Sequence, residues 1–448
     1  MAEPFDLVLS GGTIVNHDGA HAADLGIRAG RVAEIGDLSN ADTTERQDCR
    51  GLHLLPGVID TQVHFREPGL DHKEDLESGS RAAVMGGVTA VFEMPNTDPQ
   101  TVTEAALADK IARARHRMHC DFAFWVGGTH ENAGELARLE RLPGAAGIKV
   151  FVGSSTGSLL VEDDAGVRAI LKNIRRRAAF HAEDEPMLRE RRGLRVPGDP
   201  SSHSVWRSPE AALKATQRLV ALARETGARI HILHISTAEE MVYLADHKDV
   251  ASVEVTPHHL TLDGDEAYAR LGTLVQMNPP VRGGGHRAGI WRGLTQGVAD
   301  ILGSDHAPHT LAEKAKPYPD SPSGMTGVQT LVPMMLDHVN AGRLSLARFV
   351  DLTSAGPKRL FGIARKGRLS AGYDADVTVV DLKRRVTIRN EWIASKCGWT
   401  PYDGVTVTGW PVGTLVRGRR VMWEGALSDP SQGEPVVFEE TLSASDKR

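Results

Sequence analysis

Between residues 54 and 305, short apolar runs alternate with longer segments whose apolar and polar residues follow a helical pattern. The apolar runs predict buried strands at 58–64, 88–94, 121–126, 148–152, 178–181, 229–234, 252–256 and 300–304. The segments between them are rich in Ala, Leu, Arg and Glu. They predict helices that include 105–115, 164–177, 209–225 and 238–246.

Eight strands with intervening helices over about 300 residues have the size and alternation of a (β/α)8 barrel of the TIM type. A doubly wound open sheet is the alternative, but no Gly-x-Gly-x-x-Gly motif follows an early strand. We therefore predict an α/β fold in which residues 54–365 form the barrel.

Residues 1–53 and 366–425 have a different texture, with short strand-like runs separated by turn residues. Neither segment has enough strands to close a hydrophobic core by itself. We expect the two to pair into one small composite β-sandwich domain beside the barrel. Residues 426–448 are predicted to form a frayed C-terminal tail.

The composition is typical of a globular enzyme, with 448 residues of which 41% are hydrophobic and 25% charged. A net charge of −6 offers no basic surface for nucleic acid. Three scattered cysteines are too few for a disulfide framework and suit a reducing compartment. The N-terminus has no signal-peptide pattern, and no apolar run reaches the roughly 18 residues of a membrane span. These features predict a cytoplasmic protein without nucleic-acid or membrane partners.

Polar residues gather at the ends of the predicted strands. Four alternate positions share one face of the first strand: Asp60, Gln62, His64 and Arg66. The later strands end with or lead into Asn96, Lys149, His181, His234, Asp305 and His309. In a barrel, side chains at the carboxyl ends of the strands form the active site. Imidazoles and carboxylates brought together there would suit a divalent metal such as zinc.

Lys149 lies in an apolar strand, where a bare ammonium group is strongly penalised. The side chain could lose its proton, pair with a carboxylate such as Asp305, or point outward. It could also react with carbon dioxide to form a carbamate, which can bridge two metal ions. The spacing alone leaves these alternatives open.

Asp305 is a candidate general base. A carboxylate beside a metal and its water can take a proton from that water, because the metal lowers the water's pKa toward about 7. Arg66 offers a planar fork to a substrate carboxylate. Asn96 and Asn278 can orient amide groups, and His309 can make a second contact to an anion.

From about residue 6 to residue 425, the chain resembles the dihydroorotases of the amidohydrolase superfamily. The motifs that carry the resemblance are Pro-Gly-Val-Ile-Asp at 56–60, Arg-Glu-Pro-Gly at 66–69, Glu-Met-Pro-Asn-Thr at 93–97, Gly-Ile-Lys-Val-Phe at 147–151, His-Ala-Glu-Asp at 181–184, Leu-His-Ile-Ser-Thr at 233–237, Met-Asn-Pro-Pro at 277–280 and Ser-Asp-His-Ala-Pro-His at 304–309. The Arg-Glu-Pro-Gly motif favours dihydroorotase over allantoinase and dihydropyrimidinase, whose substrates lack a matching carboxylate.

The resemblance implies a zinc enzyme that reversibly cyclises N-carbamoyl-L-aspartate to L-dihydroorotate in de novo pyrimidine (UMP) biosynthesis. It implies one or two metal ions held by His64, Lys149, His181, His234 and Asp305, with Lys149 carboxylated and Asp305 as general base. It implies substrate contacts from Arg66, Asn96, Asn278, His309, Ser323 and Gly324. A homo-oligomer and an association with aspartate transcarbamoylase are also implied.

One position departs from the family pattern. The first strand motif usually has histidine at both metal-binding positions, and here the first is Gln62. An amide oxygen is a poorer zinc ligand than imidazole, so we expect the first metal to bind weakly or one zinc to suffice. The loss also fits a second hypothesis, a non-catalytic dihydroorotase-like subunit that supports aspartate transcarbamoylase. A third hypothesis is another cyclic ureidase such as allantoinase.

Overall fold

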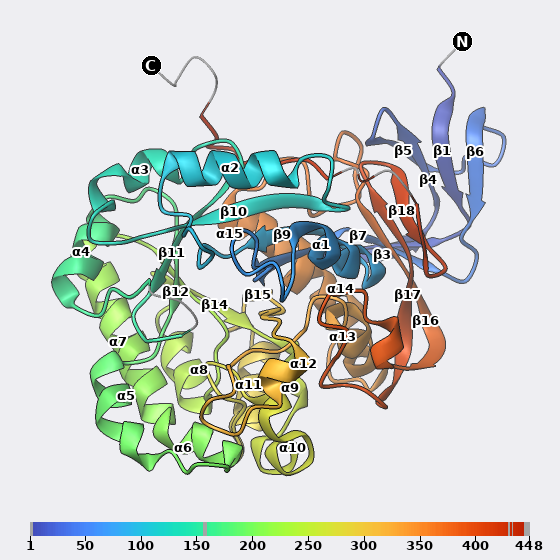
Figure 1. The fold of residues 1–448 in the computed structure, drawn as a ribbon. Coiled ribbons are helices and arrows are strands. Elements are labelled where there is room, and N and C mark those ends of the chain that lie inside the picture. Colours follow the sequence, from blue (N-terminus) through green and yellow to red (C-terminus); the bar gives the residue numbers. More distant parts are fainter. Residues whose placement is uncertain (1–2, 156–158, 429–430, 432, 443–448) are drawn as a thin grey trace.

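An eight-stranded parallel barrel forms the centre of the computed structural model, which describes residues 3–155, 159–428, 431 and 433–442 (Figure 1). Its strands follow one another in sequence order: β8 (Val58–Val63), β9 (Val88–Glu93), β10 (Asp121–Gly127), β11 (Ala145–Phe151), β12 (Ala178–His181), β13 (Ile230–Ile232), β14 (Ala251–Val255) and β15 (Ile301–Leu302). A bridge between Val63 and His306 joins the first strand to the last, so the ring nearly closes. The (β/α)8 architecture expected from the sequence is confirmed.

Helices surround the barrel (Figure 1). They are α1 (Leu76–Met85), α2 (Glu104–Ala114), α3 (Leu136–Leu139), α4 (Asp164–Lys172), α5 (Glu185–Arg191), α6 (His203–Trp206), α7 (Pro209–Thr226), α8 (Ala238–Ala245), α9 (Pro257–Thr261), α10 (Gly264–Leu271), α11 (His286–Thr295), α12 (Leu311–Lys314), α13 (Leu331–Asn340), α14 (Leu346–Val350) and α15 (Gly356–Phe361). In α7, Ala212, Ala215 and Leu219 recur three or four residues apart on the buried face. Pro209 opens that helix, and Gly227 ends it in the left-handed conformation. Within the described part of the chain, no helix is both long and apolar enough to cross a membrane.

The helix predicted at 164–177 is shorter in the structure, because α4 ends at Lys172. The backbone N–H groups of Arg175 and Arg176 donate instead to the carboxylate of Glu140. Glu140 is fully buried and therefore needs such donors. These hydrogen bonds turn the chain out of the helix and toward β12.

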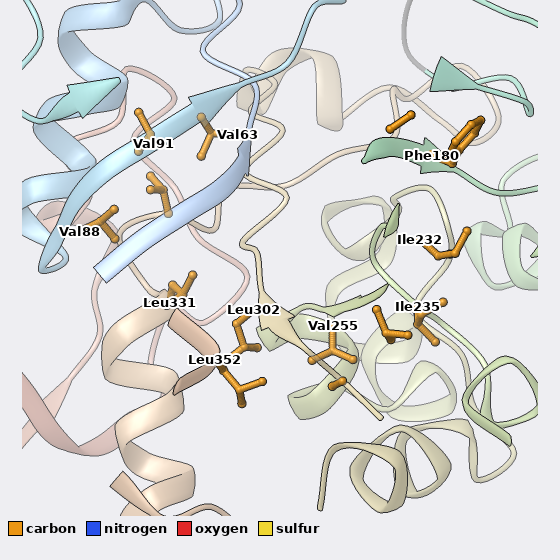
Figure 2. Packing of buried hydrophobic residues seen from close by; sticks show 14 of the residues in the cluster. Val63, Val88, Val91, Phe180, Ile232, Ile235, Val255, Leu302, Leu331 and Leu352 are labelled. Atoms are coloured by element: carbon orange, nitrogen blue, oxygen red, sulfur yellow. The ribbon is translucent and has the colours of Figure 1, made fainter. Parts of the chain in front are cut away.

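The outer surface of the barrel packs against the helices in one large hydrophobic cluster (Figure 2). Val88, Val91 and Ile232 project from their strands into this layer, and Leu331 and Leu352 meet it from the helical side. Both faces of each strand are therefore buried, which explains why the strands read as continuous apolar runs.

A separate cluster fills the barrel interior and closes its amino-terminal end. The rings of Phe92 and Phe438 pack edge to face with centroids 5.6 Å apart, and Trp125 meets Phe361 at 5.5 Å. Phe438 belongs to the segment predicted as a frayed tail. Contrary to that expectation, residues 433–442 pack against the barrel, with Phe438 buried. Residues 443–448 lie outside the described residues.

Strands from the two ends of the chain form two further sheets. The four-stranded sheet contains β1 (Phe5–Ser10), β4 (Asp24–Arg28), β5 (Arg31–Gly36) and β6 (Thr43–Asp48). The seven-stranded sheet contains β2 (Thr13–Asn16), β3 (Gly19–Ala22), β7 (His53–Pro56), β16 (Val377–Thr387), β17 (Thr406–Val416), β18 (Arg419–Trp423) and β19 (Ala426–Leu427). His53 of β7 pairs with Val380 of β16, which confirms the expected pairing across the termini. Residues 54–56, which were expected in the barrel, belong to β7 of this sheet. The domain boundaries at 53 and 366 stay a prediction.

Candidate active site

A small cavity lies at the carboxyl ends of the barrel strands, with an accessible volume of about 20 Å³. It is lined by Gln62, His64, Arg66, Asn96, Lys149, Phe151, Ser155, His181, His234, Met277, Asn278, Asp305, Ala307, Ser323 and Gly324. His309 lies directly behind this wall, in contact with Arg66. The structure therefore brings together the residues that the sequence selected.

The carboxylate of Asp305 has two neighbours from the first strand segment. Nε2 of Gln62 donates to its Oδ1 across 3.0 Å, and Nε2 of His64 lies 3.3 Å from the same oxygen. Nδ1 of His64 donates to the amide oxygen of Asn96 at 2.8 Å, which leaves the Nε2 lone pair facing Asp305 and the cavity. Burial lowers the pKa of the His64 imidazole despite Asp305, so the neutral, ligating form is favoured.

Three residues of the site have strained backbones. Arg66, His234 and Asp305 adopt φ values of 66°, 37° and 46°, in the left-handed region that non-glycine residues rarely occupy. Each follows the end of a barrel strand and turns its side chain back toward the cavity. Such strain persists where the surrounding structure over-determines it, and it is common at functional sites.

Strand alternation accounts for only part of the first motif. Gln62 lies within β8, whereas His64 and Arg66 come after its end. Asp60 was expected on the same face, but it is not part of the cavity wall. It is fully buried, and its Oδ1 accepts the backbone N–H groups of Gln62 and Ser304. Asp60 thus links β8 to the chain after β15.

His181 and His234 face each other at the ends of two neighbouring strands. Nε2 of His181 donates to Glu183 at 2.9 Å, so its Nδ1 presents a lone pair, 3.1 Å from Nε2 of His234. Burial opposes ionisation of Glu183, but the guanidinium of Arg207 and the His181 hydrogen bond hold its pKa well below the ordinary value. A carboxylate that orients a ligating imidazole in this way is a regular feature of metal sites.

Lys149 projects into the cavity from β11 and is almost completely buried. Its Nζ has no hydrogen-bond partner among the described residues and lies 4.3 Å from the centre of the Phe151 ring. Burial lowers the pKa of Lys149 to about 7, although the charge of Asp305 opposes this. In the described structure, the Lys149 side chain therefore neither points outward nor forms a hydrogen-bonded pair with a carboxylate.

Arg66 supplies a positive charge at one corner of the cavity, and His309 lies against it. Nε of Arg66 donates to the carbonyl oxygen of Pro308 at 3.2 Å, and Nη2 lies 3.4 Å from Nε2 of His309. Its Nη1 is buried and has no partner among the described residues. Burial lowers the pKa of this guanidinium to about 10, which still leaves it charged at neutral pH. A buried guanidinium with an unpaired nitrogen can accept a carboxylate.

A chain of hydrogen bonds holds the amide of Asn278. Nε1 of Trp206 donates to the Tyr318 hydroxyl at 2.7 Å, and that hydroxyl lies 3.3 Å from Nδ1 of His203. Nε2 of His203 then donates to Oδ1 of Asn278 at 2.9 Å. Because its oxygen is engaged in this way, Asn278 can turn its NH₂ group to the cavity.

Ser323 and Gly324 close one side of the cavity. The Ser323 carbonyl accepts from His309, and the Gly324 N–H donates to the carbonyl of Gln276 at 2.9 Å. Gly324 has a φ of 141°, and a Cβ at this position would meet the Ala307 carbonyl oxygen at 2.4 Å. Glycine is therefore required for this close approach.

The residues fit a metal centre whose ligands are not all of the usual types. Besides Nη1 of Arg66, three buried atoms of the cavity have no partner among the described residues: Gln62 Oε1, Lys149 Nζ and His234 Nδ1. Two nitrogens bound tetrahedrally at about 2.0–2.1 Å lie about 3.3 Å apart, close to the 3.1 Å between His181 and His234. Within the described ranges, no three His, Cys, Asp or Glu side chains are grouped to hold an ion without help. Gln62 and Lys149 occupy the positions that would complete such groups.

Sequence reasoning missed two supporting residues. Glu183, two residues after His181, orients that ring, and a His-x-Glu spacing at a strand end was the available signal. Nothing in the local sequence of His203 indicates a role. Its partner Asn278 is 75 residues away along the chain, so no local pattern could have indicated the contact.

Comparison with known proteins places the chain among hydrolases of cyclic amides. The model of the Amidohydrolase family matches residues 53–421. A dihydroorotase of Halobacterium salinarum is 40% identical over 86% of this chain and 89% of its own length, and a dihydroorotase of Methanosarcina mazei is 35% identical over 96% and 97%. Among solved structures, the L-hydantoinase (dihydropyrimidinase) from Arthrobacter aurescens superposes with a TM-score of 0.92 at 30% identity, covering 96% of this chain and 99% of that one.

Proposed function

The chain belongs to the amidohydrolase family, in its group of dihydroorotases and hydantoinases, and on that premise we propose that it is a dihydroorotase. It would interconvert N-carbamoyl-L-aspartate and L-dihydroorotate in pyrimidine biosynthesis. The observation that carries the proposal is the buried guanidinium of Arg66, whose Nη1 is unpaired among the described residues. Dihydroorotate has a ring carboxylate that this group can bind, whereas hydantoin has none.

We propose zinc as the cofactor. His64 and Asp305 would hold one ion, and His181 and His234 a second, with Lys149 between the two pairs. A lysine whose pKa is about 7 is about half neutral at that pH. Its Nζ lone pair can form an N–C bond to carbon dioxide and release a proton, which gives an anionic carbamate. Bound zinc would supply a Lewis acid that polarises the ring carbonyl and acidifies an attacking water.

The chain's own residues would move the proton and hold the substrate. In the hydrolytic direction, Asp305 accepts a proton from the attacking water and delivers it to the ring nitrogen as the amide bond breaks. In the cyclising direction the same carboxylate runs the transfer in reverse. Gln62 donates to Oδ1 of Asp305 and fixes its orientation.

The substrate carboxylate would lie against Arg66 and His309. Asn278, whose oxygen is engaged by His203, offers its NH₂ group to a ring carbonyl, and Asn96 lies on the cavity wall beside His64. Ser323 and Gly324 bring backbone over the bound ring. These contacts hold the scissile amide in reach of Asp305, which is the positioning that an intramolecular cyclisation requires.

The test is turnover of L-dihydroorotate by the purified, zinc-loaded protein, compared with the Asp305→Ala variant and an Asp246→Ala control on the exposed end of α8. We expect wild type and control to be active and Asp305→Ala to lose about 10²–10⁴-fold or more in kcat. Faster turnover of hydantoin or allantoin than of dihydroorotate would assign a different substrate. No turnover by the zinc-loaded wild type would favour the non-catalytic subunit of aspartate transcarbamoylase.

A further inference from the structure

We propose that Lys73 is a positioning residue of the carboxylate site. It holds His309 in the tautomer that presents Nε2–H to the substrate carboxylate, and it thereby favours anionic over neutral cyclic amides. This inference rests on the proposed function and names a further determinant of its substrate class.

The contact between Lys73 and His309 fixes which ring nitrogen carries the proton. Nζ of Lys73 lies 3.1 Å from Nδ1 of His309. An ammonium group can only donate, so Nδ1 must accept and the proton of the neutral ring is on Nε2. The second contact agrees, because Nε2 lies 3.0 Å from the carbonyl oxygen of Ser323, which can only accept. Lys73 and Ser323 therefore select the same tautomer, and Nη2 of Arg66, 3.4 Å from Nε2, lies beside that nitrogen without donating to it.

Glu313 holds the ammonium group of Lys73 in place, with Oε1 3.1 Å from Nζ. The same carboxylate caps α12 by accepting the N–H of Thr310 at 3.0 Å. Burial opposes its ionisation, but the Thr310 and Lys73 hydrogen bonds outweigh it and lower the pKa of Glu313 to about 2. The N-cap Thr310 of α12 follows His309 directly in the chain. Glu313, which orients Lys73, is therefore held by the residue next to His309, which Lys73 orients.

One loop of the composite β domain holds both backbones. The Cys397 thiol donates to the carbonyl oxygen of Lys73 at 3.0 Å, and Nε1 of Trp399 donates to the carbonyl oxygen of His309 at 2.8 Å. The Lys73 side chain is only 12% exposed. A flexible surface lysine would be a poor orienting group, but Lys73 is largely buried and its backbone and side chain are both held.

The charges around His309 favour an anionic ligand. Arg66, Lys73 and the buried Lys314 surround the ring, and with burial they hold the pKa of His309 well below its ordinary value. Nζ of Lys314 donates to the carbonyls of Gln276 and Pro322, and burial lowers the pKa of this lysine to about 7, so it carries only part of a positive charge at neutral pH. A substrate carboxylate that replaces the Ser323 carbonyl as the acceptor from Nε2 of His309, and that also accepts from Arg66, would balance this corner. A neutral ring would gain little from it.

Lys73→Met tests the inference by comparing anionic and neutral ligands in the zinc-loaded enzyme. Kinetics would be measured with dihydroorotate and with dihydrouracil, which lacks the carboxylate, and binding with orotate and uracil by calorimetry. We expect KM for dihydroorotate and Kd for orotate to rise about 10–100-fold, as for loss of a charge-assisted contact. Values for the neutral ligands should change less than about 3-fold, and kcat for dihydroorotate should change little.

Three further variants separate positioning from simple structural support. Lys73→Arg keeps charge and donor and should recover most of the affinity, whereas Lys73→Gln keeps a donor without the charge and should lie between. Lys383→Met, on the exposed face of β16, is the control and should match wild type. Thermal melting checks folding, and Lys73→Gln serves as the test if Lys73→Met does not fold.

Two results would overturn the inference alone: unchanged dihydroorotate kinetics in Lys73→Met, or an equal loss for anionic and neutral ligands. A wild-type enzyme that hydrolyses hydantoin but neither turns over dihydroorotate nor binds orotate would overturn the proposed function, and the inference with it. The two failures are distinguished by the behaviour of the wild type.

Discussion

Nε2 of Gln62 donates a hydrogen bond to Oδ1 of Asp305 across 3.0 Å. The family pattern would place an imidazole ligand at position 62, and the amide instead orients the proposed general base. Its Oε1 is buried and has no partner among the described residues. Gln62 thus contacts the carboxylate proposed as general base through its NH₂ group, and its unpaired oxygen offers a weaker metal ligand than imidazole would.

Gln62→His should increase the zinc content of the protein. We expect wild type to retain about one tightly held zinc per chain after dialysis, and Gln62→His to retain about two, because imidazole binds zinc better than an amide oxygen. Metal analysis by mass spectrometry gives the count. Gln296→His, at the exposed end of α11, controls for an added surface histidine. Two firmly held zinc ions in wild type would contradict this prediction.

Arg66→Met should weaken binding of dihydroorotate without unfolding the protein. The lost charge-assisted contact predicts a rise in KM of about 10–100-fold. The free energy of unfolding should not fall by a similar amount, because Met removes a buried charge that has an unpaired nitrogen among the described residues. Steady-state kinetics and urea denaturation measure the two quantities, with Arg192→Met as an exposed control. Unchanged KM would refute the carboxylate contact.

Arg207→Met should destabilise the fold and loosen the metal site. It leaves the fully buried Glu183 without its guanidinium partner, which typically costs about 3–5 kcal/mol of unfolding free energy. Since Glu183 also orients His181, zinc affinity should fall about 10–100-fold. Denaturation and competitive metal titration measure these effects. The double variant Arg207→Met/Glu183→Gln should be more stable than Arg207→Met, because it removes the unpaired buried charge, but it should not regain zinc affinity. Equal stability of the single and the double variant would argue against the buried ion pair.

Gly324→Ala should reduce activity and stability together. The new Cβ would lie 2.4 Å from the Ala307 carbonyl oxygen in a backbone conformation with φ of 141°. Relief of that clash must shift the loop that carries Ser323, at a cost of about 1–3 kcal/mol. Gly19→Ala, where nothing lies within 4 Å, is the matched control. Thermal melting and steady-state kinetics of both variants measure the effect. A Gly324→Ala enzyme with unchanged stability and activity would show that the loop can adapt and would contradict the prediction.

The pattern of apolar runs was enough to predict the barrel and to select most residues of the candidate site. Continuous apolar runs identified the strands because both faces of a barrel strand are buried, and the carboxyl ends of parallel strands must gather their polar residues at one end. That argument selected Lys149, His181 and His234 without any knowledge of their contacts. Local alternation, however, misplaced Asp60, which is buried away from the cavity wall.

The orientation of these residues depends on contacts between segments that are distant in the sequence. Arg66 reaches the cavity through a left-handed backbone that no propensity predicts, and His203 reaches Asn278 across 75 residues of chain. Lys73 and His309 are 236 residues apart and meet because a loop from the other domain holds both. Periodicity is a property of neighbouring residues, so it can place a side chain on a strand end. The hydrogen bond that selects a tautomer depends on where distant segments pack, and a local pattern does not contain that information.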